Sequence, residues 1–208
     1  MRHVALSTIR RLSLYLHFLE ECEPRGLVTV SSRALAERGG ATPAQVRKDL
    51  SFFGSFGKRG IGYPTAQLAE RVREILGLGR RYRVILVGAG RIGAALANYP
   101  GFKGRGFDVV AVYDVDPEKI GRGLDGHAVR DLAQLESDLT DQTADIAVIG
   151  TPAHAAQGIA DRLARAGVRA ILNFAPVPLV VPPGVAVTNV NMALELEALS
   201  FALNRKRA

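Results

Sequence analysis

The sequence is poor in cysteine and histidine: Cys22 is its only thiol, and there are four histidines among 208 residues. A single cysteine excludes an intrachain disulfide and a metal site built from several thiolates. The histidines show neither metal-ligand spacing nor a Ser/His/Asp arrangement, so we expect no metal. Because Cys22 follows Leu16 and Leu19 at helical spacing, we predict that it is a small core residue.

Long apolar runs are also missing. No stretch approaches the roughly 18 residues that span a bilayer, and Arg10-Arg11 and Glu20-Glu21 interrupt the apolar positions near the N-terminus. A secretory signal peptide needs an uninterrupted apolar segment there. We therefore expect a globular protein in the cytoplasm with no membrane partner, and 48% hydrophobic residues are ample for its cores.

Acidic residues are scarce in the front of the chain. Residues 1–80 hold 13 Lys and Arg against 7 Asp and Glu, a net charge of +6, whereas residues 81–208 hold 14 against 13. A local positive excess is typical of a protein that binds a polyanion, and the lack of a broad aromatic face on any basic stretch favours nucleic acid over membrane. The alternative is a basic surface that serves only solubility.

Four helices are predicted in this front segment, the last of them over residues 65–78. Apolar spacing indicates a first helix over about 4–22. Ser31-Ser32 can cap a short second helix over 33–37, which Gly39-Gly40 can end. A third helix follows over about 43–53. A short helix, a glycine turn and a well-started helix predict a helix-turn-helix.

The third helix has a strong start and two distinct faces. Thr42 is placed to cap it, with proline at the first helical position and Gln45 at the third, as in a capping box. The predicted buried face consists of Val46, Leu50 and Phe53. The predicted outward face consists of Ala44, Arg47, Lys48 and Ser51. Arginine and lysine can reach base edges or phosphates in a major groove, so this face predicts DNA contact, although solvated surface charges are the alternative.

Glycines bracket two cations after that helix, in Gly57-Lys58-Arg59-Gly60. Such a segment predicts a hairpin tip, or wing, whose cations could follow a phosphate backbone or enter a minor groove. An ordinary solvated loop is the alternative. The full predicted DNA-binding set is Ala44, Gln45, Arg47, Lys48, Ser51, Lys58 and Arg59.

A β-branched apolar run over 83–87 leads into Gly88-Ala-Gly90-Arg-Ile-Gly93 and a helix. A second strand over 107–114 ends in Asp114, 21 residues past Gly93, where a carboxylate can accept hydrogen bonds from an adenosine ribose. Because Val115 rather than a basic residue follows that acid, NAD(H) is favoured over its 2′-phosphorylated relative.

Further strands over 145–149, 169–174 and 185–187 alternate with helices and predict a doubly wound parallel sheet. Ligands bind beyond the carboxyl ends of such strands, which draws attention to the strand exits at Thr151-Pro152 and 174–176, although these could be plain strand exits. The full predicted cofactor-binding set is Gly88, Ala89, Gly90, Arg91, Ile92, Gly93, Tyr99, Asp114, Thr151, Pro152, Phe174, Ala175 and Pro176.

An enzyme is the main alternative function. Hydride transfer to a carbonyl needs a proton donor beside the nicotinamide, and His154 is the nearest candidate. No sizeable substrate domain remains after residue 190. A small NAD-dependent oxidoreductase or a coenzyme A-binding Rossmann module is therefore kept as the alternative to a non-enzymatic nucleotide sensor.

The C-terminal segment 191–206 predicts a helix with two apolar faces. One face consists of Met192, Leu196, Leu199 and Leu203. The other consists of Leu194, Ala198 and Phe201. Two apolar faces favour insertion between two bodies, as in a homodimer that exchanges terminal helices, whereas a helix deep in its own core is the alternative.

Several of these motifs together resemble the Rex family of redox-sensing transcriptional repressors, from about Ser7 to Leu203. The shared motifs are Val46-Arg-Lys-Asp-Leu-Ser-Phe-Phe-Gly54, Gly57-Lys-Arg-Gly60, Gly62-Tyr63, Gly88 to Gly93, Tyr99-Pro-Gly101, Tyr113-Asp-Val-Asp-Pro117 and Asn173-Phe-Ala-Pro176. The resemblance implies a winged-helix domain (1–79), a Rossmann domain that binds NAD(H) (80–190) and a swapped dimerisation helix (191–208).

The resemblance also implies a repressor that binds palindromic operator DNA in the presence of NAD⁺ and leaves it when NADH closes the dimer. It assigns Arg47, Lys48 and Ser51 to the major groove and Lys58 to the minor groove. It assigns Gly88, Gly90 and Gly93 to the pyrophosphate, Asp114 to the adenosine ribose, and Tyr99 to the redox-sensitive side of the pocket.

The sequence departs from the family pattern at one place. Where the family often has an acid and an aromatic at the start of the swapped helix, with an arginine on the first helix, this chain has Asn191, Met192 and His17. The resemblance therefore does not extend to an arginine–carboxylate switch.

Overall fold

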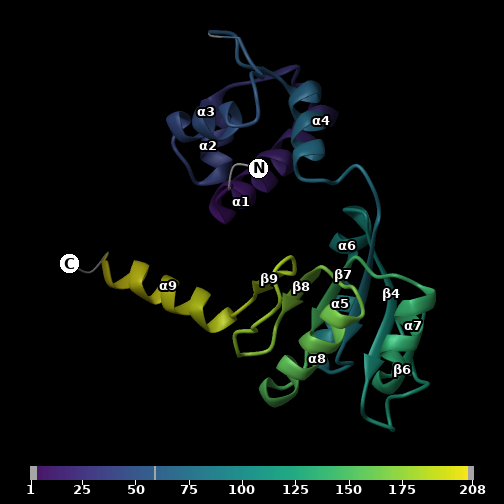
Figure 1. Cartoon of the computed structure of the whole chain (residues 1–208). Helices are drawn as coiled ribbons and strands as arrows, with labels where there is room; N and C mark the ends of the chain where they lie inside the picture. The colour runs from purple at the N-terminus through teal and green to yellow at the C-terminus, as the bar shows by residue number, and fades with distance from the viewer. Residues whose placement is uncertain (1–3, 59, 206–208) are drawn as a thin grey trace. The chain divides into compact units, whose positions relative to one another are not determined.

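The computed structural model describes residues 4–58 and 60–205, and the chain divides between Arg80 and Arg81 into two compact units (Figure 1). In this part of the chain, no helix is both long and apolar enough to cross a membrane.

The first unit is a winged helix. Its elements are α1 (Leu6–Cys22), a 3₁₀ turn (Glu23–Arg25), β1 (Thr29–Val30), α2 (Ser32–Gly39), α3 (Pro43–Ser51), β2 (Tyr63–Pro64) and α4 (Thr65–Ile75). β1 pairs antiparallel with β2, Val30 opposite Tyr63. The largest fully buried side chains of its core are Tyr15, Leu12, Leu16, Leu19, Leu35, Leu50 and Leu68. Cys22 is fully buried among them, as predicted.

The predicted capping residues are found at α2 and α3. Ser31 Oγ accepts a hydrogen bond from the Ala34 N–H at 3.1 Å, and Gly40 ends α2 with φ +59°, a conformation that glycine adopts without strain. Thr42 Oγ1 accepts from the Gln45 N–H at 3.1 Å. The third helix ends at Ser51, two residues earlier than predicted, because Phe52 and Phe53 form the closing turn.

The second unit is a Rossmann fold followed by the terminal helix α9. Its elements are β3 (Tyr82–Val87), α5 (Arg91–Ala97), α6 (Pro100–Gly104), β4 (Phe107–Asp114), β5 (Gly123–Leu124), β6 (His127–Asp131), a 3₁₀ turn (Leu132–Gln134), α7 (Leu135–Asp141), β7 (Ile146–Ile149), α8 (Ala153–Arg165), β8 (Ala170–Asn173), β9 (Ala186–Asn189) and α9 (Met192–Arg205). Within residues 60–205 seven strands form one sheet in the order β5-β6-β4-β3-β7-β8-β9. All pairs are parallel except β5 with β6. The parallel part has the strand order of dinucleotide-binding folds, with the reversal between β3 and β7.

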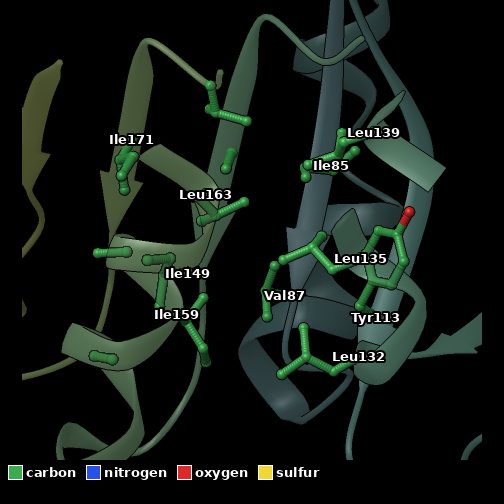
Figure 2. Close-up of a cluster of buried hydrophobic side chains, with 14 of the residues drawn as sticks. Ile85, Val87, Tyr113, Leu132, Leu135, Leu139, Ile149, Ile159, Leu163 and Ile171 are labelled. Atoms are coloured by element: carbon green, nitrogen blue, oxygen red, sulfur yellow. The ribbon is translucent and has the colours of Figure 1, made fainter. Parts of the chain in front are cut away.

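Alternate residues of the strands bury opposite faces of the sheet. Ile85 and Val87 of β3 join a core that contains Leu135 of α7 and Ile159 of α8 (Figure 2). Val84 and Leu86 face the other core, with Ala97 of α5. Helices thus cover both faces, which confirms the predicted doubly wound architecture.

The segment between Val115 and Ala144 holds structure that the sequence analysis did not predict. It contains the short hairpin of β5 and β6 and the helix α7, and β6 extends the sheet beyond β4. The sequence signal was weak because β6, His-Ala-Val-Arg-Asp, carries only one strongly apolar residue, Val129, and lies at the sheet margin. α6 was missed as well, since five residues are too few for helical periodicity.

Candidate functional site

The outward face of α3 has the composition that the sequence predicted. Ala44, Arg47, Lys48 and Ser51 are exposed, whereas Val46 and Leu50 are buried. Arg47 Nη1 donates to Ser32 Oγ at the start of α2, at 3.1 Å. That contact joins the two helices of the helix-turn-helix at the exposed face.

A groove of about 1020 Å³ lies between α3 and the loop that follows it. Arg47 and Ser51 line it from the helix, Ser32 lines it from α2, and Lys58 lines it from the loop. Hydroxyl groups and cations in a groove beside a helix-turn-helix suit a phosphate backbone.

The predicted hairpin is present. Lys58 and Gly62 exchange two backbone hydrogen bonds of 3.1 Å, which places Gly60 and Ile61 at the tip. Gly62 has φ +101°, and a Cβ there would meet the Val30 carbonyl oxygen at 2.5 Å, so only glycine fits. Lys58 is exposed beside this turn, and Ile61 is 66% exposed at the tip. Arg59, the other predicted wing cation, lies outside the described residues.

Gln45 differs from the other predicted DNA-binding residues because its side chain turns inward. It is half-buried, and its Nε2 donates to Asp49 Oδ1 at 2.8 Å instead of returning to Thr42 to complete the capping box. Only half of the capping box is therefore formed: the Thr42 side chain caps the helix, whereas the Gln45 side chain donates to Asp49.

Asp49, which the sequence analysis passed over, is the centre of that inward network. It is 3% exposed and accepts hydrogen bonds from Arg11 Nε (2.7 Å) and Nη2 (2.8 Å), and from Tyr15 Oη (3.2 Å), in addition to Gln45. Burial alone would raise the pKa of Asp49, but the bonds from Arg11 and Gln45 outweigh it and hold the pKa below its ordinary value. The ionised carboxylate ties α3 to α1.

The second candidate site surrounds the glycine turn after β3. Gly88 has φ +105°, and a Cβ on Gly93 would lie 1.9 Å from the Gly88 carbonyl oxygen. Gly90 differs from both: its φ is −79°, and a Cβ there would meet no atom within 4 Å. Gly88 and Gly93 are therefore required by the turn itself, whereas Gly90 leaves open space at the N-terminus of α5, where phosphate groups bind in such folds.

A cleft of about 760 Å³ opens at this turn, large enough for a nucleotide cofactor. The predicted cofactor residues that line it are Gly88, Gly90, Arg91, Ile92, Asp114, Thr151, Pro152, Phe174 and Pro176. They come from β3–α5 and from the ends of β4, β7 and β8, so the carboxyl ends of four parallel strands converge on one cleft. The predicted strand exits thus meet at the cleft.

Four predicted cofactor residues do not line the cleft. Ala89 and Gly93 belong to the turn itself, and Ala175 is buried behind the surface. Tyr99 is 55% exposed, packs edge-on against Phe102 and lines a separate cleft of about 510 Å³. Within one chain Tyr99 is thus away from the dinucleotide turn, and its place in the pocket stays a prediction.

Asp114 stands where the sequence predicted, at the end of β4, and is 8% exposed. Its Oδ2 accepts from the Ala89 N–H at 2.7 Å and its Oδ1 from the Asp116 N–H at 2.9 Å. Burial alone would raise the pKa of Asp114, but these backbone bonds and Lys119 hold it below its ordinary value. An ionised acid at this position can accept hydrogen bonds from ribose hydroxyls.

Sequence reasoning missed two charged residues of the cleft, Asp116 and Lys119. They follow Asp114 within the run Asp-Val-Asp-Pro-Glu-Lys, and this cluster of charge after the terminal acid was the available signal. His154 also lines the cleft and is exposed. Among residues 4–58 and 60–205, no group of three His, Cys, Asp or Glu side chains could hold a metal ion.

The terminal helix α9 exposes both of its predicted apolar faces. Met192, Leu196 and Leu203 are 66–72% exposed on one side, and Leu194 is 58% exposed on the other. This rules out burial of α9 in the core of its own unit. A large exposed apolar surface of this kind marks an interaction site.

Comparisons with known proteins cover both units. A family model described as "Putative DNA-binding protein N-terminus" matches residues 3–51, and one described as "CoA binding domain" matches residues 80–177. A "Redox-sensing transcriptional repressor Rex" from Desulfitobacterium hafniense is 46% identical over 202 residues, which are 97% of this chain and 96% of that protein.

Solved structures of RSP, a Rex-family repressor, match this chain over its full length. RSP in complex with β-NAD⁺ and operator DNA is 38% identical with a TM-score of 0.92, and covers 100% of this chain and 95% of that one. RSP in complex with β-NADH is 36% identical with a TM-score of 0.90, and covers 100% and 97%.

Proposed function

Since the chain belongs to the Rex family of redox-sensing transcriptional repressors, we propose that it binds operator DNA through α3 and the wing, and releases it when NADH fills the cleft. One observation carries the proposal: a basic helix-turn-helix face and a dinucleotide turn occur in the same chain. The RSP complexes with NAD⁺ and operator DNA and with NADH support it.

The chain is a transcriptional repressor and not an enzyme, because its relatives are named as Rex transcriptional repressors. The match to a coenzyme A-binding family is confined to residues 80–177, whereas the Rex relatives match both units. His154 is exposed and lines the cleft. Its position beside the cleft does not by itself identify a substrate that it would protonate.

The DNA-binding surface works by dividing recognition between two elements. Arg47 can pair bidentately with a guanine, and Lys48 can reach bases or phosphates of the same groove. Ala44 and Ser51 are small, which lets the backbone of α3 approach the base edges. Lys58 at the wing supplies a cation for the backbone or the minor groove. Arg59 belongs to the same proposed surface.

In this proposal, backbone groups of the glycine turn and the carboxylate of Asp114 hold the dinucleotide in the cleft. Gly88, Gly90 and the N-terminus of α5 would receive the pyrophosphate, while Asp114 would accept hydrogen bonds from the adenosine ribose. Thr151, Pro152, Phe174 and Pro176 would border the rest of the ligand. When bound, the nicotinamide supplies the redox signal as a difference in charge and shape between NAD⁺ and NADH.

We propose a homodimer in which each α9 packs against the partner, because both apolar faces of α9 are exposed in one chain. Two copies would present two α3 helices to a palindromic operator. NADH can shift such a dimer only if it binds the released state more tightly than the operator-bound state, since equal affinity shifts nothing. We also propose that the protein works in the cytoplasm, where a repressor meets both operator DNA and NADH.

Titration of NADH into a complex with fluorescently labelled operator tests the function. We expect anisotropy to fall to the value of free DNA as NADH saturates the protein, and an equal concentration of NAD⁺ to leave the complex largely intact. The operator itself is obtained beforehand by selection from random duplexes. A complex that persists at saturating NADH would refute the redox-sensor function.

Two substitutions should separate base reading from phosphate contact. Arg47→Ala is expected to weaken operator binding by about 1–3 kcal/mol and to relax base preference at one position. Lys58→Ala should instead weaken operator and random DNA alike and reduce the slope of log K against log salt by about 1. Binding measured across a salt series with both DNAs distinguishes them, and unchanged binding by both variants would rule out the assigned surface.

A further inference from the structure

Three charged side chains meet at one end of the dinucleotide cleft. Lys119 Nζ lies 3.3 Å from Asp114 Oδ2 and 3.3 Å from Asp116 Oδ2, and all three residues line the cleft. We call them the carboxylate–lysine triad. Asp114 was expected there from the strand pattern, whereas Asp116 and Lys119 have no role in the function described so far.

Backbone hydrogen bonds fix the loop that carries the triad. The Asp116 N–H donates to Asp114 Oδ1 (2.9 Å), and the Glu118 N–H donates to Asp116 Oδ1 (3.0 Å). The Lys119 N–H then donates to the Asp116 carbonyl oxygen at 3.0 Å. These nested turns restrict the loop, so the lysine is held between the two carboxylates by local structure and by charge.

The triad limits what the adenosine end of the cleft can accept. Asp114 Oδ2 accepts hydrogen bonds from the Ala89 N–H and from Lys119, and Oδ1 accepts one from the Asp116 N–H. Oδ1 therefore has the remaining acceptor capacity for a ribose hydroxyl. Lys119 is shared by two carboxylates, so the three groups carry a net charge of −1 at neutral pH. A 2′-phosphate would add about two negative charges at this place, and Lys119 is already paired with both carboxylates.

We propose that Asp116 and Lys119 are specificity-determining residues: Asp116 retains Lys119 within the triad, so the cleft favours NADH over its 2′-phosphorylated relative. This rests on the proposed binding of a dinucleotide in the cleft. Asp114 selects the ribose diol, and Asp116 holds Lys119, the cation beside Asp114, away from a 2′-phosphate. Removing the charge of Asp116 leaves Lys119 with one carboxylate partner instead of two, so that its ammonium group can also bind that phosphate.

Isothermal titration calorimetry of the full-length protein with NADH and with NADPH tests the proposal through the ratio of the two Kd values. The wild type should prefer NADH. Asp116→Asn keeps an acceptor for the Glu118 N–H and should shift the ratio toward NADPH by about tenfold. The double variant Asp116→Asn/Lys119→Gln should lose that shift, because the freed lysine is what binds the phosphate.

Glu118→Gln is the matched control. It removes one negative charge from the same loop, at an exposed residue that does not line the cleft, and should leave the ratio unchanged. An unchanged ratio in Asp116→Asn would overturn the inference, as would an equal shift in Glu118→Gln or a shift that survives in the double variant. Absence of NADH binding by the wild type would instead refute the proposed function.

Discussion

Gly90→Ala is expected to produce a repressor that folds normally, binds its operator and no longer responds to NADH. A Cβ at Gly90 would meet no atom of the free protein within 4 Å, and φ −79° suits alanine, so the melting temperature should not change. The same methyl group would occupy the space at the N-terminus of α5 that the pyrophosphate needs. We expect the Kd for NADH to rise by about 100-fold or more.

Gly93→Ala provides the contrasting control. Its Cβ would lie 1.9 Å from the Gly88 carbonyl oxygen, so the turn must move and the variant should lose thermal stability together with NADH binding. Calorimetry for NADH, thermal unfolding and operator anisotropy separate the two variants. Release of the Gly90→Ala complex at the NADH concentration that releases the wild type would show that the pyrophosphate does not lie at Gly90.

Asp49→Ala is expected to destabilise the winged-helix unit by about 3 kcal/mol, the usual cost of breaking a buried ion pair. The carboxylate is 2% exposed beside Arg11, and its loss would also deprive the buried Tyr15 hydroxyl of an acceptor. Because the pKa of Asp49 is lowered in the folded state, its contribution is complete above the ordinary carboxylate pKa of about 3.9 and is lost as the pH falls through the folded value. The effect is therefore fully present at neutral pH.

Hydrogen exchange measured by mass spectrometry localises this loss. Amides of α1 and α3 should exchange about a hundredfold faster in Asp49→Ala, while peptides of the Rossmann unit serve as an internal control. Glu21→Ala removes the exposed ion pair with Arg38 (2.9 Å) and should cost less than about 1 kcal/mol. Equal effects of the two substitutions would show that the Asp49 network adds no more than a surface pair.

Patterns confined to a few consecutive residues were predictable. The caps at Ser31 and Thr42, the faces of α3 and the glycines after β3 followed from the sequence because each depends on local backbone geometry or on a fixed periodicity. The same is true of Asp114, whose place follows from the end of a strand. The strand β6 was not predicted because its sequence shows neither a strong apolar run nor a clear alternation of apolar and polar residues.

Contacts between distant residues were not predictable. Nothing in the sequence around Asp49 indicates that its partners lie on α1, 34 and 38 residues earlier. Gln45 was assigned to the outward face because its neighbours on α3 lie there, whereas its side chain binds Asp49. Tyr99 was assigned to the cofactor pocket by resemblance, and within one chain it lines another cleft.

The sequence by itself determined the two-part plan: a basic helix-turn-helix, a dinucleotide turn, alternating strands and helices, and a terminal helix with two apolar faces. These properties depend on residue spacing and residue type, because local steric constraints determine the backbone conformation of short segments. Only the tertiary structure decided which side chains meet, because Asp49 with Arg11, and the ends of four strands around Gly90, are brought together by packing that no single segment specifies.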